Sequence, residues 1–312
     1  MRTLAVMAHY DATGQVAPHV LRQLDALAAA VDRLMVVSTA SICDPVVLKE
    51  VQQRAELVQR PNFGYDFYSY KTGLDLIEDL PGYDLVIICN DSYVGPLRNL
   101  GTIIDEMAAR PVDFWGMTRT RRRALHVQSF FVAFRSWVVK SHAFTDFWRA
   151  MTPVSDRMEV IKRYELGMSG ALLGAGFRAG SVFEETPADR RLARARHVWW
   201  AVNTVRGLPR SKRRAAWRRL PFEPWNPMAA MADRALGDAR LPLVKIDTLR
   251  YDPYRLGADH LLTACERQYP EEFSGVREYL ERTAALDPPR PGESQGPTSP
   301  PPPLRQLIGY AR

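Results

Sequence analysis

Cysteine is scarce in this sequence. Only three of the 312 residues are Cys, namely Cys43, Cys89 and Cys265, and none has a second Cys or a His at metal-ligand spacing. An odd number of widely separated cysteines does not indicate a disulfide framework, and the missing neighbours argue against a zinc site. We expect three reduced thiols, with Cys89 behaving as a small buried apolar residue.

Long hydrophobic runs are also absent. No apolar run reaches the roughly 18 to 20 residues that cross a bilayer, and the run from Leu4 to Ala8 is too short for the core of a signal peptide. The chain is nevertheless 46% hydrophobic, which is enough to bury a substantial core. These features predict a globular cytoplasmic protein with one large or two small domains.

Acidic residues are missing from one long stretch. From Arg190 to Arg219 there are eleven Lys or Arg residues and no Asp or Glu, whereas the whole chain has a net charge of +7. Tryptophan and aliphatic residues are interleaved with these charges, a mixture typical of helices on an anionic membrane surface. Pro209 and Pro221 interrupt the pattern, which predicts a pair of short amphipathic pieces. We expect them to lie on the inner face of the plasma membrane.

Two other interpretations of this basic stretch stay open. A basic face can simply keep a protein soluble, and Lys and Arg can contact the phosphates of a nucleic acid. The sequence has no recognised nucleic-acid-binding motif, so nucleic acid is not an expected partner. Sedimentation with anionic liposomes at low salt separates the membrane interpretation from the others.

Strand and helix patterns alternate along the first 185 residues, as a mostly parallel sheet flanked by helices requires. Apolar residues at helical spacing, such as Val20, Leu24 and Leu27, indicate helices that pack one face on the sheet. The predicted strands are 3–8, 34–38, 55–59, 85–89, 113–117 and 128–134. The predicted helices are 16–31, 46–55, 69–80, 97–109, 137–151 and 160–174.

The patterns after the basic stretch are weaker. Residues 226–236 and 260–269 are predicted to be helical, with a short strand over 243–246 between them. Residues 288–303 are rich in Pro, Gly and Ser and cannot assemble a core, so we expect them to be extended or disordered.

The predicted strand 85–89 ends in the polar residues Asn90, Asp91 and Ser92. In open α/β sheets, ligands bind in the crevice at the carboxyl ends of the strands, so the Asp91 carboxylate is expected at a binding site. All three residues also favour turns, and a turn that merely closes the strand is the alternative.

Four blocks of sequence carry a family resemblance. They are residues 62–73 (NFGYDFYSYKTG), 83–96, 126–131 (HVQSFF) and 164–167 (YELG). In order and spacing they resemble the rhamnan synthesis F family, bacterial glycosyltransferases of polysaccharide and lipopolysaccharide assembly. The resemblance implies a GT-A-like, Rossmann-type fold. It also implies transfer of L-rhamnose from dTDP-rhamnose to a hydroxyl of a cell-surface glycan or lipid-linked acceptor, with inversion if the donor is the β-L form.

The resemblance also suggests how the chain is organised. Residues 1–185 would form a nucleotide-sugar-binding and catalytic core. Residues 186–225 would be the basic amphipathic segment, and residues 226–285 would complete the catalytic domain. Residues 286–312 would be a Pro-rich tail.

A divalent cation is a candidate cofactor. A nucleotide-sugar donor leaves as a diphosphate, and its growing negative charge needs a metal ion or fixed cationic and N–H donors. The resemblance makes Asp91 the metal-binding residue, although its neighbours Asn90 and Ser92 are weak ligands. One carboxylate can hold Mg²⁺ or Mn²⁺ when substrate phosphates and waters supply the other oxygens.

The block that begins at Asn62 supplies candidates for donor binding. Gly64 permits a close backbone approach, Asp66 can accept hydrogen bonds from a base or ribose, and Lys71 can face a phosphate. The same block also reads as a helix start, with Asp66 or Ser69 as the N-cap.

Other donor-binding candidates come from the ends of strands. His9 and Tyr10 follow the first predicted strand, where the nucleotide base is expected. Asn90, Ser92 and Gln128 complete the expected donor set.

Glu165 is the expected general base. An inverting transfer needs a base within hydrogen-bond reach of the acceptor hydroxyl, and the resemblance places an acceptor-side carboxylate here, with His126 as a further catalytic candidate. An acid in the first turn of a helix is the alternative interpretation. Glu159 and Asp156 are rivals for the role of base. The loop 119–123 is either a cationic lid over the donor diphosphate or an ordinary exposed basic loop.

Two other functions stay open. A nucleotidyltransferase also places a carboxylate at a strand end, but it normally has a Gly-rich phosphate loop after the first strand, and residues 9–14 contain one Gly. A glycan-binding or scaffolding protein would keep the fold without the chemistry. Loss of turnover in folded Asp91→Asn and Glu165→Gln variants would favour the enzyme.

Overall fold

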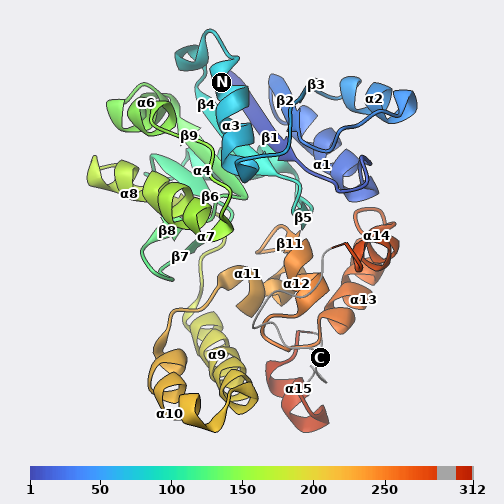
Figure 1. Cartoon of the computed structure of the whole chain (residues 1–312), viewed down its shortest axis with the longest axis vertical. Helices are drawn as coiled ribbons and strands as arrows, with labels where there is room; N and C mark the ends of the chain where they lie inside the picture. The colour runs from blue at the N-terminus through green and yellow to red at the C-terminus, as the bar shows by residue number, and fades with distance from the viewer. Residues whose placement is uncertain (287–299, 311–312) are drawn as a thin grey trace. The chain divides into compact units, whose positions relative to one another are not determined.

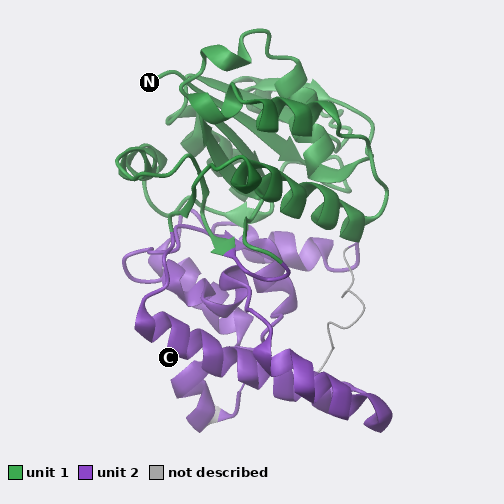
Figure 2. Ribbon diagram, turned by 90° about the vertical axis from the view of Figure 1, so that its left-hand side faces the viewer, with its two compact units in different colours: residues 1–119, 124–182 green, residues 120–123, 183–312 purple. Residues whose placement is uncertain are grey.

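The chain forms two compact units. The structure is a computed structural model that describes residues 1–286 and 300–310. Unit 1 comprises residues 1–119 and 124–182, and unit 2 comprises residues 120–123 and 183–312 (Figure 2).

Unit 1 is built on a seven-stranded sheet with the strand order β10-β6-β9-β4-β1-β2-β3 (Figure 1). The strands are β1 (Thr3–His9), β2 (Arg33–Ser38), β3 (Glu56–Gln59), β4 (Leu85–Asn90), β6 (Phe114–Gly116), β9 (Phe131–Arg135) and β10 (Ala179–Ser181). Strand β9 is antiparallel to both of its neighbours, and the other pairings are parallel. This sheet confirms the predicted α/β fold class, a mostly parallel sheet flanked by helices.

The two central strands position the ends that matter for binding. All residues of β1 and β4 are buried, as expected for parallel strands covered on both faces. From β1 the chain proceeds to β2 and β3 on one side, and β4 then pairs with β1 on the other, with Ala8 opposite Asn90. The strand order therefore reverses between β1 and β4, and crevices of this kind bind ligands in open α/β sheets.

Helices cover the sheet of unit 1. They are α1 (Pro18–Ala28), α2 (Pro45–Gln52), α3 (Tyr65–Asp75), α4 (Leu100–Ala108), α5 (Ser136–Val139), α6 (His142–Arg149), α7 (Arg157–Val160) and α8 (Leu166–Gly174). A 3-10 turn, η1 (Leu80–Gly82), follows α3, and a π-helical turn, η2 (Ile161–Glu165), joins α7 to α8. Helix α3 packs closely on β1 and β2 at Gly73. A Cβ at this position would lie only 2.4 Å from Cγ1 of Val6, so the close approach needs a glycine.

Several predicted boundaries in unit 1 are wrong for local reasons. The helix expected over 137–151 is divided, because the Ser141 side chain accepts from the Phe144 amide and starts α6. Helix α3 begins at Tyr65, and its N-cap is Gly64 rather than Asp66 or Ser69. The strand expected over 128–134 corresponds to β9, which begins at Phe131, and a separate short strand, β8 (His126–Val127), precedes it. Two further short strands are β5 (Tyr93–Val94) and β7 (Arg119–Thr120).

The described part of unit 2 is mostly helical. Its elements are α9 (Pro187–Gly207), α10 (Arg210–Arg219), η3 (Leu220–Phe222), α11 (Pro227–Ala230), η4 (Ala232–Ala235), β11 (Val244–Lys245), α12 (Ile246–Tyr251), α13 (Ala258–Gln268), α14 (Val276–Thr283) and α15 (Pro302–Ile308). Thr186 and Asp189 form a reciprocal capping box that starts α9. Pro209 separates α9 from α10, as predicted, although α9 is a long helix of 21 residues.

The predicted Pro-rich tail falls mainly outside the described residues, which omit 287–299. Pro302 and Pro303, the last two residues of the stretch 288–303 expected to be extended or disordered, are helical, since Pro is tolerated in the first turn of a helix. Among the residues that the structure describes, no helix is both long enough and apolar enough to cross a membrane.

Candidate functional site

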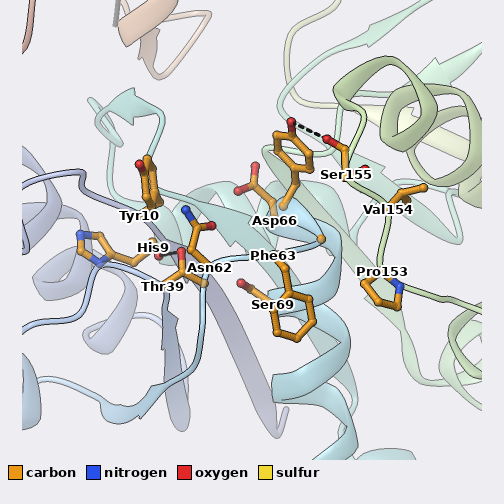
Figure 3. Close-up of a pocket in the computed structure, with 12 residues that line it drawn as sticks. His9, Tyr10, Thr39, Asn62, Phe63, Asp66, Ser69, Pro153, Val154 and Ser155 are labelled. Carbon is orange, nitrogen blue, oxygen red and sulfur yellow. Dashed lines mark hydrogen bonds between the residues drawn. The ribbon is translucent and has the colours of Figure 1, made fainter. Parts of the chain in front are cut away.

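A cavity of about 720 Å³ lies in unit 1 (Figure 3). Its wall combines the ends of β1 and β2, the loop before α3, the start of α3, and a loop before α7. The lining residues are His9, Tyr10, Thr39, Asn62, Phe63, Gly64, Tyr65, Asp66, Ser69, Pro153, Val154 and Ser155. This volume is typical of sites for small molecules and cofactors.

The loop before α3 is held in a strained shape. Gly64 and Tyr65 both have left-handed backbones, with φ of 74° and 55°, and the second is unusual for a residue with a side chain. Arg60 fixes the loop by donating to the main-chain carbonyls of Phe63 and Tyr65 at 2.7 and 3.1 Å. The Tyr65 hydroxyl donates to the Ser155 carbonyl at 3.2 Å and so ties the two loops of the cavity together.

The end of β4 is connected to this wall by Asn90. Its side-chain amide donates to the Asp66 carboxylate at 2.7 Å, and its side-chain oxygen accepts from the Ser92 main-chain N–H at 3.2 Å. Gln23, which is buried on α1, donates to the Asn90 main-chain carbonyl at 2.8 Å. Asn90 and Ser92, which were predicted to bind the nucleotide-sugar donor, thus shape the turn that carries Asp91.

Asp91 lies at the reversal point of the strand order. Its Oδ2 accepts from the main-chain N–H of Tyr10 at 2.7 Å, which joins the ends of β4 and β1. His9 Nε2 is 4.0 Å from the same oxygen. Burial lowers the pKa of His9 to about 4, so the ring is neutral at pH 7 and this contact is not an ion pair. His9 Nδ1 lies 2.9 Å from the Ser38 hydroxyl.

His126 and Glu165 form a second cluster in unit 1. His126 Nε2 lies 3.6 Å from Glu165 Oε1, and Glu165 is the last residue of the π-helical turn η2. His126 Nδ1 lies 2.9 Å from the Ala124 carbonyl, which can only accept, so this nitrogen carries the hydrogen in that contact. π-helical turns occur frequently at functional sites.

The remaining predicted residues lie in other surroundings. Gln128, two residues after His126 in sequence, accepts a hydrogen bond from the Thr118 hydroxyl at 2.7 Å. Lys71 forms an ion pair with Asp75 at 2.9 Å, one turn further along α3, and is not among the residues lining the cavity.

The rivals of Glu165 and the basic loop also have defined contacts. Asp156 is the N-cap of α7 and accepts from the Glu159 amide, while Glu159 lies 3.5 Å from Arg163. In the loop 119–123, Arg119 donates to the Ala179 carbonyl at 3.3 Å.

Sequence reasoning missed several cavity residues. Thr39, Phe63, Tyr65 and the loop 153–155 line the cavity without having been singled out. Phe63 and Tyr65 lie inside the quoted block 62–73 and could have been found there. The loop 153–155 gave no local signal, because its position depends on contacts with residues about 90 positions away.

The described residues at the site offer neither a nucleophilic cysteine nor a metal site made of protein side chains alone. All three cysteines are free, and burial raises the pKa of the Cys89 thiol well above its usual range, which disfavours a nucleophilic thiolate. Within residues 1–286 and 300–310, no three His, Cys, Asp or Glu side chains gather into a group that could hold a metal ion by themselves.

Comparison with known proteins decides the family. A sequence model described as "Rhamnan synthesis protein F" matches residues 34–218, more than half of the chain. The chain belongs to the rhamnan synthesis protein F family. The resemblance noted in the sequence is therefore confirmed. The match includes the cavity loops from Asn62 onward, the basic helix α9 and all of α10 except its last residue.

Two relatives of known sequence match this chain over only part of their own length. The virulence protein VirA of Vibrio anguillarum is 32% identical over 126 residues, which are 39% of this chain and 40% of VirA. A protein of Sinorhizobium fredii, y4gN, is 26% identical over 132 residues and is matched over 34% of its length. The match thus spans well under half of the relatives' length.

Solved structures of nucleotide-using enzymes are distantly similar. Glucosyl-3-phosphoglycerate synthase from Mycobacterium tuberculosis, solved with Mn²⁺, UDP and phosphoglyceric acid, is 14% identical, with a TM-score of 0.33. That match covers 67% of this chain and 80% of the synthase. A nucleotidyl transferase from Methanothermobacter thermautotroptrophicus is 13% identical, with a TM-score of 0.36 and coverage of 58% and 86%. Both TM-scores are low, so the family match alone decides the membership.

Proposed function

We propose that this family member is a glycosyltransferase that binds a nucleotide-sugar donor in the cavity of unit 1. The observation that carries the proposal is the position of Asp91. It does not itself line the cavity, but it accepts from the main-chain N–H of Tyr10, which does, where the strand order reverses. A sheet of this kind binds ligands at that point. The family is described as rhamnan synthesis protein F, and this description supports a role in rhamnan synthesis.

The cavity offers a place for the nucleoside. Tyr10, Phe63 and Tyr65 expose 49%, 45% and 43% of their surface, although rings of this size are usually more buried. Figure 3 shows Asn62 and Asp66 between Tyr10 on one side and the loop 153–155 on the other. Exposed rings suit stacking with a base, and the amide and carboxylate suit hydrogen bonding to the base edge or ribose.

A divalent cation fits this site only together with the donor. Asp91 provides one carboxylate, and one of its oxygens already accepts from the Tyr10 amide. Mg²⁺ and Mn²⁺ are held in such sites by one or two carboxylates plus substrate phosphates and waters. We assign Asp91 as the residue that would hold the ion, which would neutralise the charge of the departing diphosphate.

We assign Glu165 as the general base, with His126 beside it at 3.6 Å. The acceptor hydroxyl would lose its proton to Glu165, and its oxygen would bond to the anomeric carbon. The bond from that carbon to the diphosphate would break, and its electron pair would leave with the nucleoside diphosphate. We propose L-rhamnose from dTDP-rhamnose as the sugar, with inversion, and a hydroxyl of a glycan or lipid-linked saccharide as the acceptor.

The first test measures the thermal midpoint of the purified protein with dTDP, UDP, GDP and their sugars, with and without Mg²⁺ or Mn²⁺. Binding to the native state raises the midpoint. A shift with dTDP or dTDP-rhamnose that requires the cation and disappears in Asp91→Asn would support the donor site. If none of the nucleotides shifts the midpoint, a glycan-binding or scaffolding role would replace the enzyme.

The second test concerns the base. Glu165→Gln should lower turnover by about 100-fold or more while leaving donor binding unchanged, because a positioned base typically contributes 10² to 10⁴ in rate. Glu159→Gln is the matched control, since Glu159 lies less than two turns away and contacts Arg163. Equal losses in both variants would remove Glu165 from the role of base.

A further inference from the structure

The basic stretch of the sequence is not one continuous surface. In α9, Arg196 is 1% exposed and donates to Asp233 and to main-chain carbonyls of unit 2. Trp199 donates to the Arg255 carbonyl at 3.1 Å, and the Trp200 ring lies 5.9 Å from that of Tyr254. Much of α9 therefore serves the interior of unit 2 and is not available for a partner.

Helix α10 has the opposite character. Six of its ten residues are Lys or Arg, none is acidic, and none is buried. Within the described part of the chain, its one ion pair to an acidic side chain joins Arg219 to Glu223 at 3.1 Å. Arg213 donates to the carbonyls of Arg206 and Leu208 at the end of α9, so this side chain is used in the connection between the helices.

Large aromatic side chains are exposed among these charges. Trp217 is 49% exposed and Phe222, in the following turn η3, is 71% exposed. Arg210 and Arg214 precede Trp217 by seven and three residues, a spacing that places all three on one face of a helix. The turn η3 is held against α9, because the Leu220 carbonyl lies 2.7 Å from Nε2 of His197 in that helix.

We propose that α10 and η3 form a docking surface for an anionic phospholipid bilayer. Lys and Arg near the headgroups supply the attraction, and Trp217 and Phe222 are the amphipathic and apolar side chains that enter the headgroup region. A surface that merely keeps the protein soluble would need no exposed Trp or Phe. The inference does not depend on the proposed transferase activity.

The binding test uses sedimentation with two kinds of vesicles, phosphatidylcholine alone and phosphatidylcholine with phosphatidylglycerol. The test variant is Arg210→Gln/Arg214→Gln/Arg218→Gln. It removes three charges that form no ion pair with an acidic side chain within the described residues, where the ion pair of α10 is made by Arg219. The control is Lys49→Gln/Lys140→Gln/Arg267→Gln, which removes three exposed charges outside α10. The whole chain is used throughout.

We expect wild type and control to bind the anionic vesicles alike and not the neutral ones. The α10 variant should bind about 100-fold more weakly, because each basic residue near an anionic surface contributes roughly fivefold. Equal binding by the α10 variant and the control overturns the proposal. The proposal is also overturned if the wild-type protein stays in the supernatant with the anionic vesicles. Binding of the wild type to an oligonucleotide, measured separately, would then favour nucleic acid as the partner.

A second readout tests insertion of the aromatic side chain. Brominated phosphatidylcholine in the anionic vesicles should quench part of the tryptophan fluorescence of the wild type and less of it in Trp217→Phe. Quenching that is unchanged by Trp217→Phe would show that another face meets the membrane, and this result would also overturn the proposal.

Discussion

The side-chain amide of Asn90 donates to the carboxylate of Asp66 across 2.7 Å and thereby ties the end of β4 to the first turn of α3. The oxygen of the same amide accepts from the main-chain N–H and the hydroxyl of Ser92. One side chain thus fixes both the turn that carries Asp91 and a carboxylate on the cavity wall.

Removing this side chain should therefore be costly. Asn90→Ala is expected to lower the free energy of unfolding by about 1 to 3 kcal/mol, because partly buried groups lose their partners. Urea unfolding measures the change. Asn203→Ala is the control, since among the described residues the Asn203 amide donates only to the Trp199 carbonyl of its own helix. A cost no larger than that of the control would mean that the Asn90 network contributes little.

Gly64 should not tolerate a side chain. Its φ is 74°, and a Cβ there would lie 2.6 Å from Cβ of Tyr68. Gly64→Ala should lower the free energy of unfolding by more than about 1 kcal/mol, since the left-handed backbone alone costs that much. In contrast, Gly170 lies exposed in α8 with nothing within 4 Å of an added Cβ.

The matched variant, Gly170→Ala, should raise the free energy of unfolding by about 0.5 to 1 kcal/mol, because Ala is the better helix former. Chemical unfolding of both variants gives the comparison. Opposite signs are expected, and stabilisation by Gly64→Ala would show that the loop before α3 relaxes freely.

The central part of the fold could be predicted because its signals are local. Strands β1 and β4 are short, continuously apolar runs, and such runs indicate buried parallel strands. The position of Asp91 followed from the same pattern, because polar residues directly after a buried strand must lie at the edge of the sheet. The reversed direction of β9 could not be read in this way, since strand pairing is decided by distant partners.

The cavity wall shows a similar division. The loop from Asn62 to Asp66 stood out through its polar and Gly residues, whereas the loop 153–155 reaches the cavity only through the fold. Arg196 shows why charge runs mislead, because it belongs to the basic stretch in sequence and yet is 1% exposed in unit 2. Composition counts charges, but burial depends on whether the structure supplies enough hydrogen-bond acceptors.

Arg196 offers a stability test of its own. Its guanidinium donates to Asp233 and to the main-chain carbonyls of Ile308, the last residue of α15, and of Gly309, which follows it. Arg196→Met should lower the free energy of unfolding by about 3 to 5 kcal/mol, because it leaves a poorly compensated carboxylate and unpaired carbonyls. The control Arg191→Met, at an exposed position of the same helix, should change it by less than about 0.5 kcal/mol.

Thermal and urea unfolding of both Arg variants report the difference. A wild-type-like Arg196→Met protein would mean that the C-terminal segment is not held by this guanidinium.

His9 should make the protein sensitive to acid. Burial lowers the pKa of His9 from the ordinary 6.5 to about 4, so the unfolded chain binds a proton at a pH where the folded chain does not. The free energy of unfolding should therefore fall as the pH drops from about 6.5 to about 4, by up to about 3 kcal/mol from this residue. Above pH 6.5 the contribution is constant.

The measurement is the free energy of unfolding of wild type and His9→Gln between pH 7.5 and about pH 4. Gln can still hydrogen bond Ser38 but does not titrate, so the difference between wild type and variant should shrink or change sign as the pH falls. His142→Gln, at an exposed position, is the control and should leave the pH dependence unchanged. Parallel pH curves for wild type and His9→Gln would mean that the His9 ring takes up its proton without unfolding. In that case the ring could form an ion pair with Asp91, 4.0 Å away, at mildly acid pH.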